Sequence, residues 1–493
     1  MKVLVIGIDA LDSLVLDRLI DQLPNFKKLM ESFSYYRVVS TFPPDSDTAW
    51  ATIVTGMNPA EHGIVKFVDP LEKSYQLLNK RTENRALAGN TFWDAASNAG
   101  YKAAAIFPHL CFPVWEIKNG VMVSRASTTV DPEEKVVQSS SEGYLDLYPD
   151  PGILDGVRGF PDRGYKGMLQ YAKNIKHLTA SDAEFALRVM QKENWDLFFV
   201  YFSTIDAIGH FFWNYFDKDD PNFKEGNPLQ NVIPEIYKLY DDIVERFLSK
   251  ITEDTEVIIL SDHGHGARPL NLVNVNEVLR QNGLLVTSAS ATKISATVFE
   301  KVKRLSLKFI SRFGLGKLAG RIMRNFPGAV QSFTRPSMID WENTTAYATD
   351  MSGIKAYTYG GIMINQSAIL EDTTYEEVRS KVIKLIEDNC KLPGGTSLVK
   401  FICRREELNY EGPYLDKYPD IVMEFKYGYG VGWAINVPLL TQAASYNLVP
   451  GSHRGDTGVC FIKSKILRES QSTVNLKDIF DIVVNWMPKA SRQ

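Results

Sequence analysis

Cysteine is scarce in this chain, and no cysteine pair has the spacing of a metal-binding or redox motif. The 493 residues include four cysteines, Cys111, Cys390, Cys403 and Cys460. This pattern argues against a disulfide framework and against a thiolate zinc site, and it is typical of a protein in a reducing compartment. We therefore expect a cytoplasmic protein.

Long hydrophobic runs are also missing. Because no stretch of about 18 apolar residues occurs, the sequence predicts no transmembrane helix. The first nine residues, Met1 to Asp9, have no charged segment leading into a longer apolar run and no small-residue cleavage site. They predict a buried strand and not a signal peptide.

A basic excess is absent as well. The net charge is −4, whereas generic nucleic-acid binding needs a clear surplus of lysine and arginine, so we expect no nucleic-acid partner. The content of 44% hydrophobic and 23% charged residues is ordinary for a globular enzyme. A chain of this length predicts either a large core with insertions or two domains.

Apolar runs that alternate with helical patterns fill most of the chain. Residues 3–8, 102–107, 195–202 and 256–260 read as buried strands, and residues 11–23, 91–98, 179–192 and 233–251 as helices. Later strands are predicted at 346–349, 355–359, 361–365, 420–425 and 459–463, and later helices at 374–389 and 476–487. This alternation predicts an α/β fold, a three-layer α/β/α sandwich with a central, mostly parallel sheet.

Two segments interrupt this pattern. Residues 125–167 are rich in Ser, Pro, Gly and acids and predict a surface excursion, either a lid or a plain insertion. Residues 284–340 contain nine Lys/Arg and one acid, Glu300, between Lys293 and Arg324. They predict an inserted helical cap, with the core in 1–283 and 341–493. Its basic face either contacts an anionic membrane or substrate, or is simply solvated.

Ser46 stands where an extended, proline-containing segment leads into a predicted helix over residues 49–54 that stops at Gly56. A serine at this point is often only an N-cap. The alternative is functional, because unpaired N–H groups and the helix dipole at an N-terminus favour a bound phosphate and an ionised hydroxyl.

Acidic and imidazole side chains follow several of the predicted strands, where ligands bind in open α/β sheets. Asp9 ends the first strand, either as a cap of the next helix or as a functional group. The set continues with Asp206, His210, Asp262, His263 and His453, the last in a glycine-flanked loop. Three carboxylates and three imidazoles without cysteine suit two Zn²⁺ or similar ions. Such a pair of ions would activate Ser46 for phosphoryl transfer.

Five separated motifs then resemble one known family. They are Gly7-Ile8-Asp9, the segment from Pro43 through Gly63, Asp206 to His210, Ser261 to Gly264, and Gly451 to His453. In this order they resemble the alkaline phosphatase superfamily, in particular its type I phosphodiesterase/nucleotide pyrophosphatase branch. The resemblance extends from the first strand to about residue 463, without the basic insertion.

The resemblance implies a set of roles for the motif residues. One metal ion would be held by Asp206, His210 and His453, and the other by Asp9, Asp262, His263 and the Ser46 oxygen. The implied nucleophile is Ser46, with Thr48 as the alternative, and the implied reaction passes through a phospho-seryl enzyme that water hydrolyses. The ions are expected to be Zn²⁺, with Mn²⁺ as an alternative.

The sequence departs from the family pattern shortly after His62-Gly63-Ile64. Nucleotide pyrophosphatases carry an Asn there that contacts the phosphoryl oxygen, whereas this chain has Val65-Lys66-Phe67-Val68. Lys66 or Arg454 would supply the missing substrate contact, unless both are ordinary surface charges. The remaining histidines are interpreted separately: His62 as fixing the loop after the nucleophile helix, His265 as either supporting a ligand or exposed, and His109 and His177 as unrelated to the site.

These observations predict a metal-dependent phosphohydrolase that acts on small-molecule phosphate mono- or diesters. A sulfatase is disfavoured because the segment from Ser46 to Trp50 lacks the Pro and Arg of the sulfatase signature. Two alternatives use the same residues, namely a phosphotransferase or mutase and a catalytically silent metal-binding protein. The sequence does not indicate an oligomeric state.

Overall fold

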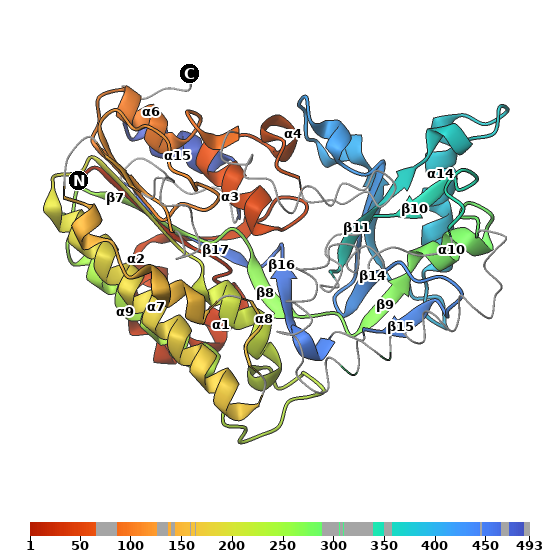
Figure 1. Cartoon of the computed structure of the whole chain (residues 1–493), viewed down its shortest axis with the longest axis horizontal. Helices are drawn as coiled ribbons and strands as arrows, with labels where there is room; N and C mark the ends of the chain where they lie inside the picture. Colours follow the sequence, from red (N-terminus) through yellow and green to blue (C-terminus); the bar gives the residue numbers. More distant parts are fainter. Residues whose placement is uncertain are drawn as a thin grey trace. The chain divides into compact units, whose positions relative to one another are not determined.

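The structure, a computed structural model, describes residues 1–65, 86–125, 137–139, 143–157, 159–162, 164–287, 305, 309, 339–349, 357–443, 446–464 and 473–487. The chain forms two compact units (Figure 1). Unit 1 is Met1–Ile64, Arg81–Gly266 and His453–Gln493, and unit 2 is Val65–Lys80 and Ala267–Ser452. The units thus divide at other points than the predicted cap boundaries, and most of residues 284–340 lie outside the described residues. The helical cap stays a prediction.

Unit 1 is built on a mostly parallel sheet, which has nine strands among the described residues. In spatial order they are β18 (Thr473–Asn475), β2 (Ser34–Val39), β17 (Gly458–Lys463), β7 (Glu256–Leu260), β1 (Val3–Ile8), β6 (Leu197–Phe202), β3 (Ala103–Ile106), β4 (Gly120–Val123) and β5 (Val137–Ser139). The five strands from β7 to β4 are parallel to one another. The predicted strands 3–8 and 256–260 match β1 and β7 to the residue.

The registers of β1 bring three strand ends to one edge of the sheet. Gly7 pairs with Tyr201 of β6 and with Leu260 of β7. β1 is buried along its whole length, which explains its unbroken apolar sequence. The residues that directly follow β1, β6 and β7 therefore meet at the carboxyl edge, where ligands bind in such sheets.

Helices cover both faces of this sheet, so the predicted three-layer α/β/α sandwich is confirmed. Figure 1 shows α2, α7 and α9 along one face and α3, α6 and α15 along the other. The helices of unit 1 include α1 (Ser13–Leu19), α2 (Pro24–Ser32), α3 (Ser46–Thr55), α4 (Pro59–His62), α6 (Phe92–Asn98), α7 (Tyr165–Lys192), α8 (Thr204–Phe216), α9 (Val232–Leu248) and α15 (Asp478–Asn485). Apolar side chains of α3, α6 and α15 share one core with β1, β3 and β6.

Unit 2 has its own apolar core between sheets and helices. An antiparallel sheet has the order β10 (Ala346–Ala348), β11 (Tyr359–Ile364), β13 (Ile421–Phe425), β12 (Val399–Arg404). A second sheet joins β14 (Tyr429–Gly432), β9 (Asn271–Asn274) and β15 (Leu440–Gln442), and the helices include α10 (Val275–Gln281) and α14 (Tyr375–Asn389). Thr287 and Ile339 form an antiparallel bridge, so these two described residues on either side of the basic segment lie next to each other.

Several predicted elements have different bounds. The predicted helix 11–23 is α1 followed by a 3₁₀ turn at Ile20–Gln22, and its N-cap is Asp12, which accepts from Leu14 and Val15 N–H. The interpretation of Asp9 as the cap of this helix is therefore wrong. The predicted helix 179–192 is only the second half of α7. No described helix combines the length and the apolar character that crossing a bilayer requires.

The excursion over residues 125–167 is described in part. It includes β5 and two 3₁₀ helices, η3 (Leu145–Leu147) and η4 (Pro151–Gly156), and its last residues already belong to α7. A role as a lid remains a prediction.

Candidate metal centre and nucleophile

Ser46 is the first residue of α3, and its hydroxyl faces the carboxyl edge of the sheet. The N-cap of α3 is Asp45, whose side chain accepts from the Asp47 N–H at 3.1 Å. Ser46 Oγ lies 3.1 Å from His263 Nε2 and 3.4 Å from Asp9 Oδ1. The interpretation of Ser46 as the N-cap is therefore wrong, because Asp45 does the capping. The Ser46 hydroxyl is directed toward the acidic and imidazole cluster.

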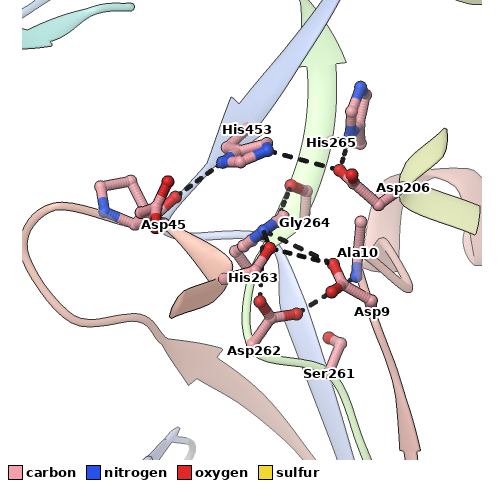
Figure 2. A network of polar contacts seen from close by, with 12 residues as sticks. Asp9, Ala10, Asp45, Asp206, Ser261, Asp262, His263, Gly264, His265 and His453 are labelled. Carbon is pink, nitrogen blue, oxygen red and sulfur yellow. Dashed lines mark hydrogen bonds and ion pairs between the residues drawn. The ribbon is translucent and has the colours of Figure 1, made fainter. Parts of the chain in front are cut away.

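The first group of candidate ligands consists of Asp9, Asp262 and His263, all buried (Figure 2). Asp9 follows β1 directly, and its Oδ2 accepts from the Tyr201 hydroxyl at 2.5 Å. Asp262 Oδ1 accepts from the N–H of Ala10 at 3.2 Å. Ala10 has φ = 59°, a left-handed conformation that costs about 1–2 kcal/mol in a residue with a Cβ. The chain thus accepts local strain in the turn that fixes Asp262.

The second group consists of Asp206, His210 and His453. Asp206 and His210 lie four residues apart on α8, so that they share one helix face. His453 lies on β16 (Gly451–Arg454), which pairs with β8 (Gly264–Ala267). Asp206 and His210 follow the end of β6, as predicted, and they do so on helix α8. The predicted loop position of His453 is wrong, because His453 lies in a strand. Nε2 of each imidazole lies 3.3 Å from Asp206 Oδ1.

The orientation of two imidazoles shows that both groups suit a cation. His263 Nδ1 donates to the Gly264 carbonyl and His453 Nδ1 to the Pro44 carbonyl, each at 2.9 Å. In the neutral rings the Nε2 lone pairs then face carboxylate oxygens. His263 Nε2 lies 3.2 Å from Asp262 Oδ2, and His453 Nε2 lies 3.3 Å from Asp206 Oδ1. Asp206 Oδ1 and Asp262 Oδ2 are buried without a hydrogen bond among the described residues. Lone pairs that converge on buried anionic oxygens are typical of metal ligands.

The carboxylates have perturbed proton affinities. Burial, together with the charges of Asp262 and Asp206, raises the pKa of Asp9 well above its usual value. Burial likewise raises the pKa of Asp262 to about 7. Burial also acts on Asp206, but the charge of His210 and the contacts of His265 and His453 outweigh it and lower its pKa. A buried divalent cation would favour the ionised form of all three.

His265 is buried beside the second group, so of the two sequence interpretations the exposed one is wrong. Its Nδ1 lies 3.5 Å from Asp206 Oδ1, and its ring packs against Trp213 with centroids 5.6 Å apart. Gly209 of α8 makes room for this ring, because a Cβ at this position would lie 2.7 Å from its Cδ2. The glycine between Asp206 and His210 is therefore a packing requirement of His265.

The sequence interpretation did not assign two residues of this region to the site, His109 and Tyr201. His109 follows β3, and its Nε2 lies 2.6 Å from Oδ1 of Asp47, the residue after Ser46. The prediction that His109 is unrelated to the site is thus wrong. Tyr201, which contacts Asp9, was hidden in the apolar strand β6. The signal for both is positional, because each lies at or after the carboxyl end of a strand next to β1 or β6.

The predicted substrate contacts, Lys66 and Arg454, and the alternative nucleophile, Thr48, remain to be placed. Lys66 lies outside the described residues. Arg454 follows His453 on β16 and so points to the opposite face, where its Nη2 lies 3.4 Å from Asp456 Oδ1. Thr48 is fully buried in α3.

His62 contacts Thr52 Oγ1 and accepts from the Ile64 N–H, each at 3.0 Å, which confirms that it fixes the loop after α3. His177 is exposed on α7.

Comparisons with known proteins identify the family of the chain and proteins of similar fold. A family model for type I phosphodiesterase / nucleotide pyrophosphatase matches residues 3–432. Human ectonucleotide pyrophosphatase / phosphodiesterase 5 is structurally similar at 14% identity and a TM-score of 0.50, over 100% of this chain and 96% of that chain. A murine form of the same protein, inactive and in complex with AMP, gives 12% identity and the same TM-score and coverage.

A bacterial hydrolase is also similar. Phosphonoacetate hydrolase from Sinorhizobium meliloti 1021, in complex with phosphonoacetate, has 15% identity and a TM-score of 0.54, over 98% of this chain and 95% of that chain. No curated protein matches the sequence significantly. At these identities the solved structures support the fold.

Proposed function

Since the chain belongs to the type I phosphodiesterase / nucleotide pyrophosphatase family and is thus a hydrolase of phosphoric ester bonds, we propose that it works through a phospho-seryl intermediate on Ser46 at a two-metal site. Asp9, Asp262, His263 and the Ser46 oxygen would hold one divalent ion. Asp206, His210 and His453 would hold the other. Zn²⁺ suits this donor set best, and Mn²⁺ is the alternative.

The position of the Ser46 hydroxyl carries the proposal. It lies within 3.4 Å of both Asp9 Oδ1 and His263 Nε2, at the first turn of a helix whose cap is a different residue. The helix N-terminus adds a positive dipole end, which favours an anionic phosphoryl group at this point. Together these features suit a serine that attacks phosphorus.

The chain's own residues prepare and follow this attack. Tyr201 and Ala10 hold Asp9 and Asp262 by hydrogen bonds, so that the acidic groups keep their orientation while Ser46 reacts. Ser46 Oγ forms the bond to phosphorus as the ester oxygen leaves, and the proton of the hydroxyl is transferred overall to the released alcohol. Water then cleaves the phospho-seryl bond, which releases the phosphate and restores the hydroxyl. Bound divalent ions would supply Lewis acidity toward the phosphoryl oxygens.

Two artificial esters test the proposal. Hydrolysis of p-nitrophenyl phosphate and of bis-p-nitrophenyl phosphate is measured with the wild type, Ser46→Ala and Thr48→Ala, each supplied with Zn²⁺ or Mn²⁺. We expect activity that is lost in Ser46→Ala and retained in Thr48→Ala, and mass spectrometry of the acid-quenched wild type is expected to find phosphate on Ser46. The preferred ester separates a monoesterase from a diesterase.

The other outcomes point to defined alternatives. Equal activity of the wild type and Ser46→Ala would refute the serine nucleophile. Loss of activity in Thr48→Ala alone would assign the nucleophile to Thr48. Transfer of the phosphoryl group to an added alcohol in preference to water would indicate a phosphotransferase.

A further inference from the structure

The two cations that the sequence suggested for substrate contact have no demonstrated place at the nucleophile. Lys66 lies outside the described residues, and Arg454 lies on the face of β16 opposite His453, close to Asp456. The Asn that the family carries after the nucleophile helix has no counterpart in residues 65–68. We therefore consider the described side chains around Ser46 as donors to the substrate's phosphoryl oxygens.

His109 is a candidate for such a donor, and Asp47 holds its ring by a hydrogen bond. The Nε2 atom of His109 lies 2.6 Å from Oδ1 of Asp47, a short charge-assisted hydrogen bond. Asp47 immediately follows Ser46 in the first turn of α3. Because Asp47 engages Nε2, the other ring nitrogen, Nδ1, is the one left to contact a substrate.

The surroundings place His109 on the Asp9 side of the candidate site. Its ring centroid lies 5.4 Å from that of Tyr201, whose hydroxyl donates to Asp9 at 2.5 Å. The side chains of His109 and Asp47 are 25% and 29% exposed, whereas those of Asp9 and His263 are 3% and 0% exposed. The pair is thus next to the buried group and accessible to a substrate.

The charge of Asp47 gives a second reason why His109 and Asp47 should act together toward an anionic substrate. An unpaired carboxylate at Asp47 would repel an incoming phosphate ester. Burial opposes the charged form of His109, but the hydrogen bond and the charge of Asp47 outweigh it and raise its pKa to about 9. The hydrogen bond therefore presents the imidazole to the substrate in place of a lone carboxylate.

We propose that His109 contacts a phosphoryl oxygen of the substrate and that Asp47 is the positioning residue for His109. This inference rests on the proposed function, because it assigns a substrate contact at the same site. It adds a residue pair that replaces the missing Asn. His109 would stabilise the negative charge on the phosphoryl oxygens during attack by Ser46.

The test compares His109→Gln, His109→Asn, Asp47→Asn and the double variant Asp47→Asn/His109→Gln, with His177→Gln as the matched control on exposed α7. The values of kcat and KM for both nitrophenyl esters are measured, together with the affinity of the metal-supplied protein for inorganic phosphate. Metal content and melting temperature are recorded for every variant.

We expect kcat/KM to fall about 10- to 100-fold in His109→Gln, the size typical of a lost hydrogen bond to a charged group. Phosphate affinity should fall as well, while metal content stays at the wild-type level. Asp47→Asn should have a smaller effect that does not add to that of His109→Gln, because both changes act on the same contact. His177→Gln should equal the wild type.

Other results would overturn the inference. Wild-type kcat/KM and wild-type phosphate affinity in His109→Gln would exclude a substrate contact, as would a loss explained fully by lower metal content. Should the His109 variants unfold, unchanged phosphate affinity in folded Asp47→Asn would argue against the positioning role. A wild type inert on both esters would contradict the proposed function instead, and the phosphate measurement would still decide the question of His109.

Discussion

Nε2 of His210 lies 3.1 Å from Nε2 of His453, and both atoms lie 3.3 Å from the same carboxylate oxygen of Asp206. Three donor atoms at such mutual separations surround one cation well, because metal–ligand bonds of about 2 Å place tetrahedral ligands slightly more than 3 Å apart. Without a cation, this buried arrangement sets lone pairs against one another. The stability of unit 1 should thus depend on bound metal.

Removal of metal is the first prediction. We expect a chelator to lower the melting temperature, and Zn²⁺ or Mn²⁺ to restore it, since a ligand at about 100 times its Kd stabilises by about 2.7 kcal/mol. Differential scanning calorimetry with and without chelator measures the shift. His453→Ala should respond less to added metal than the wild type, whereas His177→Ala should respond equally. Identical melting of the wild type in all conditions would contradict a metal site.

Gly209→Ala is the second prediction. In an ordinary helix interior this change stabilises by about 1 kcal/mol. Here the new Cβ would lie 2.7–2.8 Å from ring atoms of His265, so we expect destabilisation of about 1–3 kcal/mol and weaker metal binding. Thermal melting and chelator competition measure the two effects. The double variant Gly209→Ala/His265→Ala should be more stable than Gly209→Ala, because the clash is gone; the absence of this rescue would refute the packing explanation.

The third prediction concerns His62, which holds the loop after α3. His62→Ala would leave Thr52 Oγ1 and the N–H of Ile64 without this partner, so we expect a loss of about 1–3 kcal/mol. Metal content should be unchanged because His62 is not in either ligand group. Melting temperature and metal analysis test both statements. An exposed histidine serves as control, and His177→Ala should change stability by less than about 0.5 kcal/mol.

The fourth prediction is a pH dependence that comes from the pair of His109 and Asp47. The pKa of His109 is raised from 6.5 to about 9, mainly through Asp47 acting against burial, with added contributions from Asp9 and Asp262. A histidine with a raised pKa contributes stability that is fully present below pH 6.5 and is lost as the pH rises through 9. We expect the melting temperature of the wild type to fall over this range.

Asp47→Asn is the control for this pH dependence. It removes the partner that raises the pKa, so the decline between pH 6.5 and pH 9 should become shallower. Melting curves across the range measure both proteins in the same buffers. Parallel declines in the two proteins would show that other groups cause the pH dependence.

The sequence predicted the sheet and the two groups of candidate ligands because both depend on local patterns. Unbroken apolar runs identified β1 and β7 to the residue, and a ligand after a strand end identified Asp9 and Asp262. Local patterns did not predict which side chains distant in the sequence contact each other. His109 meets Asp47 across 62 residues, and Tyr201 meets Asp9 across 192 residues. Such contacts follow from strand order and register, which a single sequence leaves open.

The secondary structure around His453 was also beyond prediction from local sequence. Its glycine-flanked segment predicted a loop, but the segment is strand β16, paired with β8, whose sequence begins directly after His263. Short strands with glycine have weak local signals, and pairing supplies what the local sequence lacks. The capping of α3 by Asp45 and not Ser46 was equally undecided, since either residue type caps helices well.

The order of the ligands along the chain has a consequence for biosynthesis. Five of the six candidate ligands, Asp9, Asp206, His210, Asp262 and His263, precede the main segment of unit 2, Ala267–Ser452, and His453 follows it. A ribosome that has made unit 2 has therefore not yet made the second ion's last ligand. Translation proceeds at about 5–20 residues per second. The nascent chain thus spends many seconds with a nucleophile and an incomplete centre, and chains truncated within unit 2 should be inactive.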